Sequence, residues 1–335
     1  MKKLSIIYYP TEQKPQGRYA ATIGTFDGIH LGHQSVVSQL RAAASARGLR
    51  SMVITFERHP RQVLQPEWKP KLLTTLNEKT ELFAQMGIDV LVVLRFDLAM
   101  SALSSRQFME QVLKRDLGVE LLLMGYDNHF GNDRSACFND YVAYGRELDM
   151  EVLCGEPADV NGLRASSTLV RNLLEEGRVA QAALCLGRPY SLTGRVVHGQ
   201  QIGRQLGFPT ANILPDDPFH LIPAPGVYAV RIAVLPDDPA PADGLPSPLP
   251  DDALLQGMMN IGTRPTFNGQ RTTLETHIFD FTGNLYDCRL TIFFIGRLRD
   301  EQAFASPQDL AAQMHRDAIE AQVLLSAPND PSHNP

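Results

Sequence analysis

Two histidines in a glycine-rich stretch are the first residues of this chain whose types and spacing indicate chemistry. His30 and His33 lie three positions apart in the string Gly-Thr-Phe-Asp-Gly-Ile-His-Leu-Gly-His at residues 24–33. Glycine lets a backbone approach a ligand closely, and a helix that begins after such a loop offers free N–H groups and the positive end of its dipole. Two imidazoles at this spacing add donors on one helix face. The combination suits phosphate.

A second polar string, Ala-Ser-Ser-Thr-Leu-Val-Arg at residues 165–171, has the Ser/Thr pattern of a helix N-cap. Arg171, one turn into that helix, would bring positive charge beside free N–H groups, which is what a pyrophosphate leaving group needs. Alone, the string also fits an ordinary capped helix.

A polar loop at residues 125–135 follows an apolar run, which is where parallel sheets place ligand-binding loops. This loop also fits a plain surface loop.

The third string, residues 194–212, is rich in glycine and ends in Pro-Thr-Ala-Asn. Glycine-rich backbone can wrap phosphates, and Thr210 and Asn212 offer neutral oxygen ligands to a Mg²⁺ ion that keeps most of its waters. The chain has no Gly-x-x-x-x-Gly-Lys-(Ser/Thr) motif. A phosphate site here would therefore not be a P-loop.

These strings together resemble the family of bacterial bifunctional riboflavin kinase/FAD synthetases. Residues 24–33 resemble the Gly-(Thr/Phe)-Phe-Asp-Gly-(Val/Ile)-His-x-Gly-His signature of nucleotidyltransferases in its FAD synthetase version, and residues 166–171 resemble their Ser-Ser-Thr-x-(Ile/Val)-Arg motif. Residues 194–212 resemble the riboflavin kinase signature. The resemblance covers roughly residues 15 to 325, with the motifs in order.

The resemblance implies two ATP-dependent reactions. The C-terminal half would phosphorylate riboflavin to FMN, and the N-terminal half would adenylylate FMN to FAD with release of pyrophosphate. The phosphate of FMN is already an ionised nucleophile, so its activation needs only positioning, charge stabilisation and Mg²⁺. The riboflavin hydroxyl needs a base. Glu275, in the alternating string Leu-Glu-Thr-His at residues 274–277, matches the family's general base and would be an inward carboxylate of a small barrel.

The resemblance also implies roles for individual residues. The catalytic residues would be Glu275, His30, His33 and Arg171, and the Mg²⁺ ligands Thr210 and Asn212. Residues in contact with nucleotide or flavin would be Gly24, Phe26, Asp27, Gly28, Gly125, Asp127, Ser166, Ser167, Thr168, Gly199, Gly203, Arg204, Gly207, Pro209, Thr210, Asn212 and Arg299. The chain departs from the family pattern at Asn128 and His129, which replace bulkier or more basic residues, and at Asp287, where glycine is usual.

Two alternatives remain open. The chain could retain only the adenylyltransferase activity, with an inactive barrel. The altered Asn128-His129 pair would also permit the converse, an active kinase with a weak synthetase. The chain could also be a non-catalytic regulator that binds flavin or nucleotide. An active enzyme is favoured over the regulator because the chain has kept Glu275, Thr210, Asn212 and both histidines.

Strands and helices must alternate in the N-terminal half to position these residues. Continuous apolar runs at 19–23, 51–56, 90–94, 120–124 and 151–153 are separated by helical patterns, among them 34–46, 77–86 and 104–117. Such runs predict a parallel sheet with helices on both faces. The resemblance makes this a Rossmann-like nucleotidyltransferase domain, and we place it at residues 1–187.

The C-terminal half has a different texture. Short β-rich runs at 191–197, 226–234, 255–259, 272–279 and 290–295 predict a small antiparallel barrel or sandwich, and residues 307–325 predict a helix. The resemblance selects the barrel, as a riboflavin kinase domain at residues 188–326. The Pro/Asp-rich segment 235–252 is expected to be a flexible insertion and residues 327–335 a disordered tail.

Composition limits the classes of protein. A chain of 335 residues is long enough for two domains, and a net charge of −6 without a basic cluster argues against nucleic-acid binding. Four scattered cysteines argue against a zinc site and a disulfide framework. The apolar run before Pro10 is too short for a membrane span. We therefore expect a soluble cytoplasmic protein without nucleic-acid or membrane partners, whose oligomeric state, a weak homo-oligomer included, is open.

Overall fold

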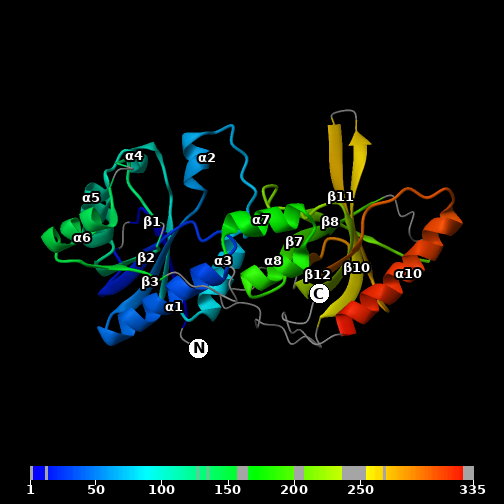
Figure 1. Ribbon diagram of the computed structural model, residues 1–335, viewed down its shortest axis with the longest axis horizontal. Helices are drawn as coiled ribbons and strands as arrows, with labels where there is room; N and C mark the ends of the chain where they lie inside the picture. The colour runs from blue at the N-terminus through cyan, green and yellow to red at the C-terminus, as the bar shows by residue number, and fades with distance from the viewer. Residues whose placement is uncertain are drawn as a thin grey trace. The chain divides into compact units, whose positions relative to one another are not determined.

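A computed structural model describes residues 3–11, 14–126, 128–133, 136–156, 165–199, 207–235, 254–266 and 269–326 of the chain (Figure 1). By its internal contacts the chain divides into two compact units, residues 1–165 and 166–335. The first is an α/β unit and the second a β-barrel with helices, which confirms the predicted fold class. Among the described residues, no helix has the length and apolarity to cross a membrane.

The first unit is built on a parallel six-stranded sheet in the order β1-β4-β3-β2-β5-β6. The strands are β1 (Ser5–Tyr9), β2 (Tyr19–Ile23), β3 (Arg50–Phe56), β4 (Val90–Leu94), β5 (Val119–Met124) and β6 (Glu151–Cys154). Alternate residues of each strand enter two separate apolar clusters, Met52 and Ile54 on one face and Val53 on the other. Both faces are therefore covered, as the continuous apolar runs predict.

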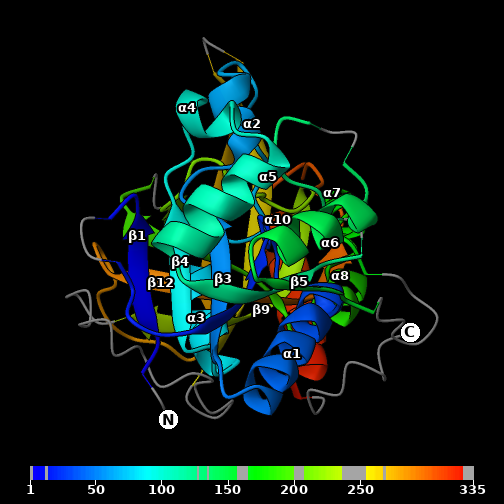
Figure 2. The ribbon, with the colours of Figure 1, turned by 90° about the vertical axis from the view of Figure 1, so that its left-hand side faces the viewer.

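Helices cover these two faces (Figure 2). The helices α1 (Leu31–Ala46) and α3 (Leu76–Gln85) pack on one face, and α5 (Ser105–Phe108), η1 (Met109–Asp116) and α6 (Phe138–Glu147) pack on the other. The predicted helix at 104–117 is thus a short α-helix continued by a π-helix. The short helices α2 (Pro60–Leu64) and α4 (Leu98–Ser101) lie in loops after β3 and β4.

Strand β1 was not predicted. Its residues read as an isolated apolar start to the chain, yet they form an edge strand parallel to β4. Ile6 packs against the cluster on one face of the sheet and Ile7 against the cluster on the other. The strand depends on β4, which comes about 80 residues later.

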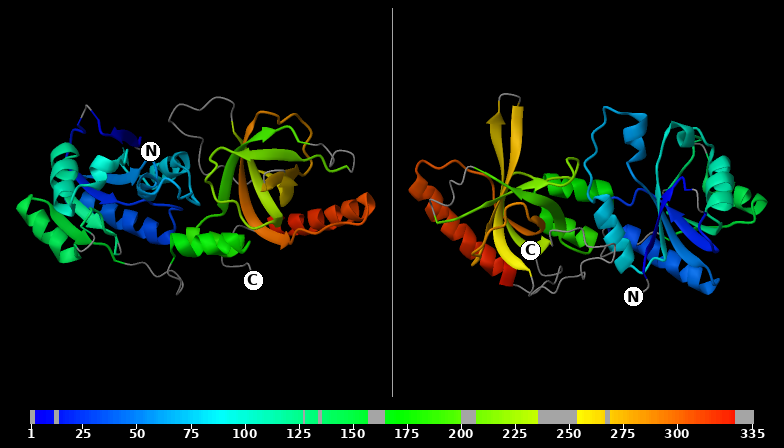
Figure 3. Two further views of the ribbon diagram at one scale, coloured as in Figure 1. Left: turned by 90° about the horizontal axis from the view of Figure 1, so that it is seen from above. Right: turned by 180° about the vertical axis from the view of Figure 1, so that it is seen from behind.

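The second unit is a closed antiparallel barrel in the order β10-β11-β8-β7-β12-β9 (Figure 3). Its strands are β7 (Tyr190–Val197), β8 (Ala211–Pro215), β9 (Gly226–Leu235), β10 (Leu255–Thr266), β11 (Gly269–Ile278) and β12 (Arg289–Arg299). The helix α10 (Pro307–Ser326) packs on the outside, where Ala321 and Leu325 contact a cluster that includes Val227 and Met258. The barrel and its C-terminal helix confirm the prediction. The proposed insertion after Leu235 and the tail lie outside the described residues.

Two helices precede the barrel within the same unit. These are α7 (Ser167–Glu175) and α8 (Val179–Leu186), which ends at Gly187 in the left-handed conformation, with φ 69°. Helix α8 contacts β7 and β12, and the carbonyl of Leu174 accepts a hydrogen bond from Ala224 N–H at 2.9 Å. These helices therefore pack as part of the barrel unit.

Candidate functional sites

The predicted phosphate loop leaves the sheet at its topological switch point. After β2 the chain adds β3 and β4 on one side, then returns to add β5 on the other side of β2. Open α/β sheets bind ligands at such a point, outside the carboxyl ends of the strands. Residues 24–33 follow β2, and residues 125–133 follow β5. The loop after β5 reaches the end of β2, since the Asn128 side-chain amide donates a hydrogen bond to the carbonyl of Ile23, the last residue of β2.

The histidine pair begins α1. His30 is its N-cap, with Nδ1 accepting the backbone N–H of His33 at 3.4 Å. The two imidazoles are stacked, with ring centroids 3.7 Å apart and an angle of 22° between their planes. Burial lowers the pKa of His33 well below its usual value, and the nearby charges of His30 and Lys79 lower it further. His33 is therefore a neutral imidazole at pH 7, a hydrogen-bonding group rather than a cation.

The loop before this pair is held in an unusual conformation. Phe26, Gly28 and Ile29 have φ of 46°, 85° and 39°, and only glycine adopts such values readily. Asp27 is 2% exposed, and its Oδ1 accepts the N–H groups of Leu73 at 2.9 Å and Thr74 at 3.2 Å. This oxygen, which was expected to contact nucleotide, ties the loop to the chain before α3.

Phe26 and Gly24 shape the same loop by packing. The Phe26 ring lies edge-on to His33 and to Phe83 of α3, with centroids 5.2 and 5.5 Å away. A Cβ on Gly24 would lie 3.2 Å from the Phe26 ring. Phe26 is thus a support beneath the histidines.

The loop after β5 is anchored by residues that the motifs did not identify. The carbonyl of Phe130 accepts hydrogen bonds from the hydroxyls of Ser105 and Tyr141, both at 2.7 Å. A Cβ on Gly131, whose φ is 96°, would lie 2.4 Å from the backbone nitrogen of Ser105. Asp127 lies outside the described residues. Gly125, at the start of this loop, accepts the N–H of Asn128 at 3.1 Å.

The string at 165–171 forms the predicted capped helix. Ser166 is the N-cap of α7, with its Oγ accepting the N–H of Leu169 at 3.2 Å. Ser167, Thr168 and Arg171 lie in the first turns of α7. These residues belong to the second compact unit, whereas the histidine pair belongs to the first.

In the barrel, strand register brings predicted residues from distant parts of the sequence into one row. Asn212 on β8 lies opposite Glu275 on β11, which lies opposite Asn260 on β10. The row continues through Val227 on β9 to Arg299 on β12. Directly opposed residues project from the same face of a sheet. Asn212, Glu275 and Arg299 therefore share one face.

That face is the outer face of the barrel, not its interior. Leu274, Thr276 and Ile278 are buried, and Glu275 and His277 alternate with them. Glu275, Thr210, Asn260 and Arg299 line a cavity of about 320 Å³ together with residues of α10 such as Met314 and Asp317. The prediction of an inward carboxylate is wrong, because side chains fill a small barrel and the space for a ligand lies between its wall and α10.

Arg299 is fixed within this cavity by Asp317, which the motifs did not identify. The two residues form a bidentate ion pair, with Nε–Oδ1 at 3.0 Å and Nη2–Oδ2 at 2.7 Å. Asp317 is 2% exposed and also accepts a hydrogen bond from Gln313 Nε2 at 2.8 Å. The only sequence signal was an acidic residue on the apolar face of the terminal helix.

A second cavity of about 660 Å³ lies beside the first and shares Thr210 with it. Pro209, Thr210, Thr276 and Tyr286 are among its lining residues. The carbonyl of Pro209 lies 2.9 Å from Nδ1 of His277, which holds this segment against β11. Gly203 and Arg204 lie outside the described residues.

For two glycines of residues 194–212, Gly199 and Gly207, the structure shows why a larger residue would not fit. A Cβ on Gly199 would lie 2.1 Å from Nδ2 of Asn212, so the Asn212 amide rests directly on the glycine. Gly207 has φ 83°, in the left-handed region that favours glycine. The side chain of Asn212 thus excludes a Cβ at position 199, and the backbone conformation favours glycine at position 207.

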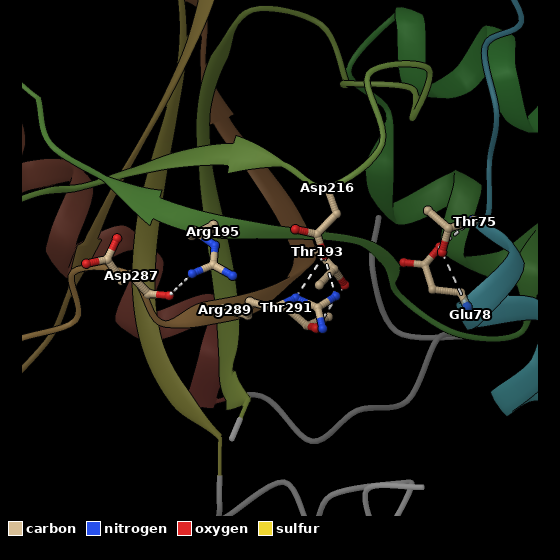
Figure 4. A network of polar contacts seen from close by, with 8 residues as sticks. All are labelled: Thr75, Glu78, Thr193, Arg195, Asp216, Asp287, Arg289 and Thr291. Atoms are coloured by element: carbon tan, nitrogen blue, oxygen red, sulfur yellow. Dashed lines mark hydrogen bonds and ion pairs between the residues drawn. The ribbon is translucent and has the colours of Figure 1, made fainter. Parts of the chain in front are cut away.

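Asp287 stands where the family usually has glycine, and the turn forms with aspartate in that position. Asp287 adopts φ 66°, the conformation for which glycine is suited. Its carbonyl accepts a hydrogen bond from Arg195 at 3.1 Å. Figure 4 shows this contact beside the Arg289–Asp216 pair and the Thr193–Thr291 contact, and also the capping box of Thr75 and Glu78 that begins α3.

Comparison with known proteins matches both halves of the chain. The FAD synthetase family model matches residues 12–169, and the riboflavin kinase family model matches residues 186–325. The bifunctional riboflavin kinase/FMN adenylyltransferase of Pseudomonas fluorescens is 38% identical over 307 residues, covering 91% of this chain and 93% of that protein. The protein of the same name from Escherichia coli K12 is 36% identical over 311 residues, covering 92% and 93%.

A solved structure has the same overall fold. A protein of Streptococcus pneumoniae, described as a macrolide-efflux protein, superposes with a TM-score of 0.82 over 96% of this chain and 99% of that one, at 27% identity.

Proposed function

This chain belongs to the family of bifunctional riboflavin kinase/FMN adenylyltransferases, and we propose how its residues divide the two reactions. It phosphorylates riboflavin with ATP to give FMN, and it adenylylates FMN with ATP to give FAD and pyrophosphate. One observation supports the assignment of the two reactions to two sites. Glu275 lines a cavity of the barrel unit, whereas the histidine pair lies at the switch point of the sheet in the other unit.

In the kinase reaction, Glu275 accepts the proton of the riboflavin 5′-hydroxyl. The freed oxygen attacks the γ-phosphorus of ATP, and ADP leaves. The flavin occupies the cavity lined by Glu275 and Arg299, and ATP occupies the larger cavity, with its phosphates near Gly199, Gly207 and Pro209. Thr210 lines both cavities, which supports phosphoryl transfer at that position.

The residues around Thr210 fit a Mg²⁺ ion. Thr210 and Asn212 offer neutral oxygens, and the carboxylate of Glu275 lies across from Asn212. No group of three or more His, Cys, Asp or Glu side chains able to hold a metal occurs among the described residues. Such a donor set suits a cation that keeps waters and takes its other ligands from the triphosphate, whose charge it would neutralise.

In the adenylyltransferase reaction, an ionised phosphate oxygen of FMN attacks the α-phosphorus of ATP, and pyrophosphate leaves. No proton has to be removed, so the residues act by position and charge. The neutral imidazole of His33, the ring of His30 and the first N–H groups of α1 bind phosphate oxygens. Gly24, Gly28 and Gly125 let the backbone approach the nucleotide, and Asp127 is a further contact in this proposal. Ser166, Ser167, Thr168 and Arg171 are assigned to the departing pyrophosphate by their motif alone.

Gly199→Ala tests the placement of Asn212. The added Cβ would lie 2.1 Å from Asn212 Nδ2, so the amide must turn away. Disturbing a group that holds a metal ligand costs roughly 10- to 100-fold in metal affinity. We expect FMN formation to need correspondingly more Mg²⁺, measured as initial rate against Mg²⁺ concentration. Gly296→Ala, which adds a methyl group near Leu324 only, is the matched control. An unchanged Mg²⁺ dependence in Gly199→Ala would remove Asn212 from the metal site.

The functional boundary at 187/188 is also a proposal. Helices α7 and α8 pack within the barrel unit, so a fragment that begins at residue 188 would expose apolar surface of β7 and β12. We expect a fragment of residues 166–335 to make FMN at the rate of the full chain and a fragment of residues 188–335 to be less stable, with both compared by thermal unfolding. Equal stability would show that the kinase domain needs neither helix.

Product analysis with riboflavin, ATP and Mg²⁺ tests the assignment of both activities. We expect FMN to appear first and FAD with pyrophosphate to follow. FMN alone would mean that only the kinase is active, and unchanged riboflavin would support the non-catalytic regulator. The cytoplasmic location, the absence of nucleic-acid and membrane partners, and the alternative of a weak homo-oligomer stay predictions from the sequence.

A further inference from the structure

A buried lysine lies beneath the phosphate loop and has no part in the reactions described above. Lys79, on α3, is 7% exposed, and its Nζ donates a hydrogen bond to the carbonyl of Thr25 at 2.8 Å. That carbonyl also lies 3.3 Å from the hydroxyl of Thr55 on β3. Burying an ammonium group is costly unless its charge and its hydrogen bonds are used.

The hydrogen bond is made where the loop needs support. Thr25 immediately precedes Phe26, the first of the residues with left-handed backbone, and such residues persist only when their surroundings fix them. Helix α3 supplies two of the fixing contacts, from Lys79 to Thr25 and from Phe83 to Phe26. The chain before α3 supplies others, through Thr74 to Asp27 and Gly28.

Burial lowers the pKa of Lys79, and titratable groups from three elements interact with it. Asp27 lies in the loop, Glu78 precedes Lys79 on α3, and His33 lies on α1 next to His30. Asp27 and Glu78 oppose the lowering of the Lys79 pKa by burial. Lys79 in turn helps to lower the pKa of His33. A cation held at this point favours the neutral imidazole and adds positive potential where the triphosphate binds.

We propose that Lys79 is a positioning residue of the adenylyltransferase, which fixes the phosphate loop through the Thr25 carbonyl and, when protonated, adds positive potential at the histidine pair. The proposal rests on the function assigned to that loop. It gives Lys79 two separable tasks, one for the hydrogen bond and one for the charge.

Three substitutions in the full-length enzyme separate these tasks. Lys79→Met removes both, Lys79→Gln keeps a donor for the carbonyl without the charge, and Lys79→Arg keeps the charge. The rate of FMN formation by the barrel of each variant shows whether the chain has folded. This rate should equal that of the wild type in all three variants. Lys114→Met is the matched control, because Lys114 donates to the carbonyl of Asp149 at 2.7 Å in the same unit but away from the loop.

We expect Lys79→Met to slow FAD formation from FMN by roughly 10- to 100-fold, because a displacement of about 1 Å costs this much in catalysis. The pKa of His33, followed by NMR on histidine-labelled protein, should rise in Lys79→Met and Lys79→Gln and stay at the wild-type value in Lys79→Arg.

An unchanged His33 pKa in Lys79→Gln, or a wild-type rate of FAD formation in Lys79→Met, would overturn the proposal. The NMR measurement needs no catalysis, so it separates a failure of this proposal from a failure of the proposed function. If wild-type protein formed no FAD while the His33 pKa still rose in Lys79→Gln, the proposed function would be wrong and the electrostatic role of Lys79 would stand.

Discussion

Glu275→Gln is expected to stop FMN formation while leaving FAD formation from supplied FMN at the wild-type rate. The substitution keeps the size of the side chain but removes the group that accepts the hydroxyl proton. General-base catalysis contributes roughly 10²- to 10⁴-fold to a rate, and we expect a loss of that size in the kinase. The other reaction starts from an ionised phosphate and needs no base. Initial rates of the two reactions, measured separately by chromatography of the flavins, check the prediction.

The matched control for this substitution is Glu320→Gln, which removes a carboxylate from the exposed side of α10. It should leave both rates unchanged. A Glu275→Gln variant that formed FMN at the wild-type rate would show that another group, or bulk water, accepts the proton. The cross-strand row of Asn212, Glu275 and Asn260 would then be a binding surface only.

His33→Ala is expected to do the reverse, so that riboflavin is converted to FMN and FAD does not follow. Removing one preorganised hydrogen-bonding group from a phosphoryl-type site costs roughly 10²- to 10³-fold in rate. The ring of His33 is stacked on His30 and lies against Phe26, so the substitution also removes support from the loop. The N-cap is kept, because His30 Nδ1 accepts the backbone N–H of residue 33.

The kinase activity of the His33→Ala chain is its internal control, and FMN should accumulate at the wild-type rate. Unimpaired FAD formation would show that the phosphate groups are held without this imidazole. Arg171 and the N–H groups at the start of α1 would then be the candidates for that role.

The motif residues could be predicted from the sequence because each motif is local. A strand, a glycine loop and a helix start follow one another within about 25 residues at 19–46, and the structure has them in those places. Strands β1 and β8 could not be predicted in the same way. Five residues become a strand only when a partner from far along the chain pairs with them, and β8 begins inside a string whose polar residues read as a loop.

The supports of the sites could not be predicted either, because they come from other elements. Asp317, Ser105 and Tyr141 reach their partners only after the chain has folded. Nothing in the neighbourhoods of Ser105 and Tyr141 marks them, and Asp317 is marked only as an acidic residue on the apolar face of its helix. Asp27 shows that a motif can identify a residue of a site without giving the role of its side chain. Its motif predicted contact with a ligand, and the structure shows that Oδ1 of its buried carboxylate holds the loop to Leu73 and Thr74.

The outward orientation of Glu275 follows from the alternation of its own strand. Leu274 and Ile278 are apolar and four residues apart, so strand alternation places them on the face opposite Glu275. The predicted inward carboxylate would have faced an interior that side chains such as Leu274 fill. The terminal helix α10 covers the outer face instead and creates the cavity there.

The most direct test of the two-site account is complementation between the two variants. Glu275→Gln and His33→Ala, each purified as the full chain, are mixed and given riboflavin, ATP and Mg²⁺. Alone, the first should leave riboflavin and the second should stop at FMN. Mixed, they should form FAD, because FMN released by the barrel of one molecule is the substrate for the intact phosphate loop of the other. A mixture that forms no FAD, although wild-type protein forms it, would contradict two sites that work independently.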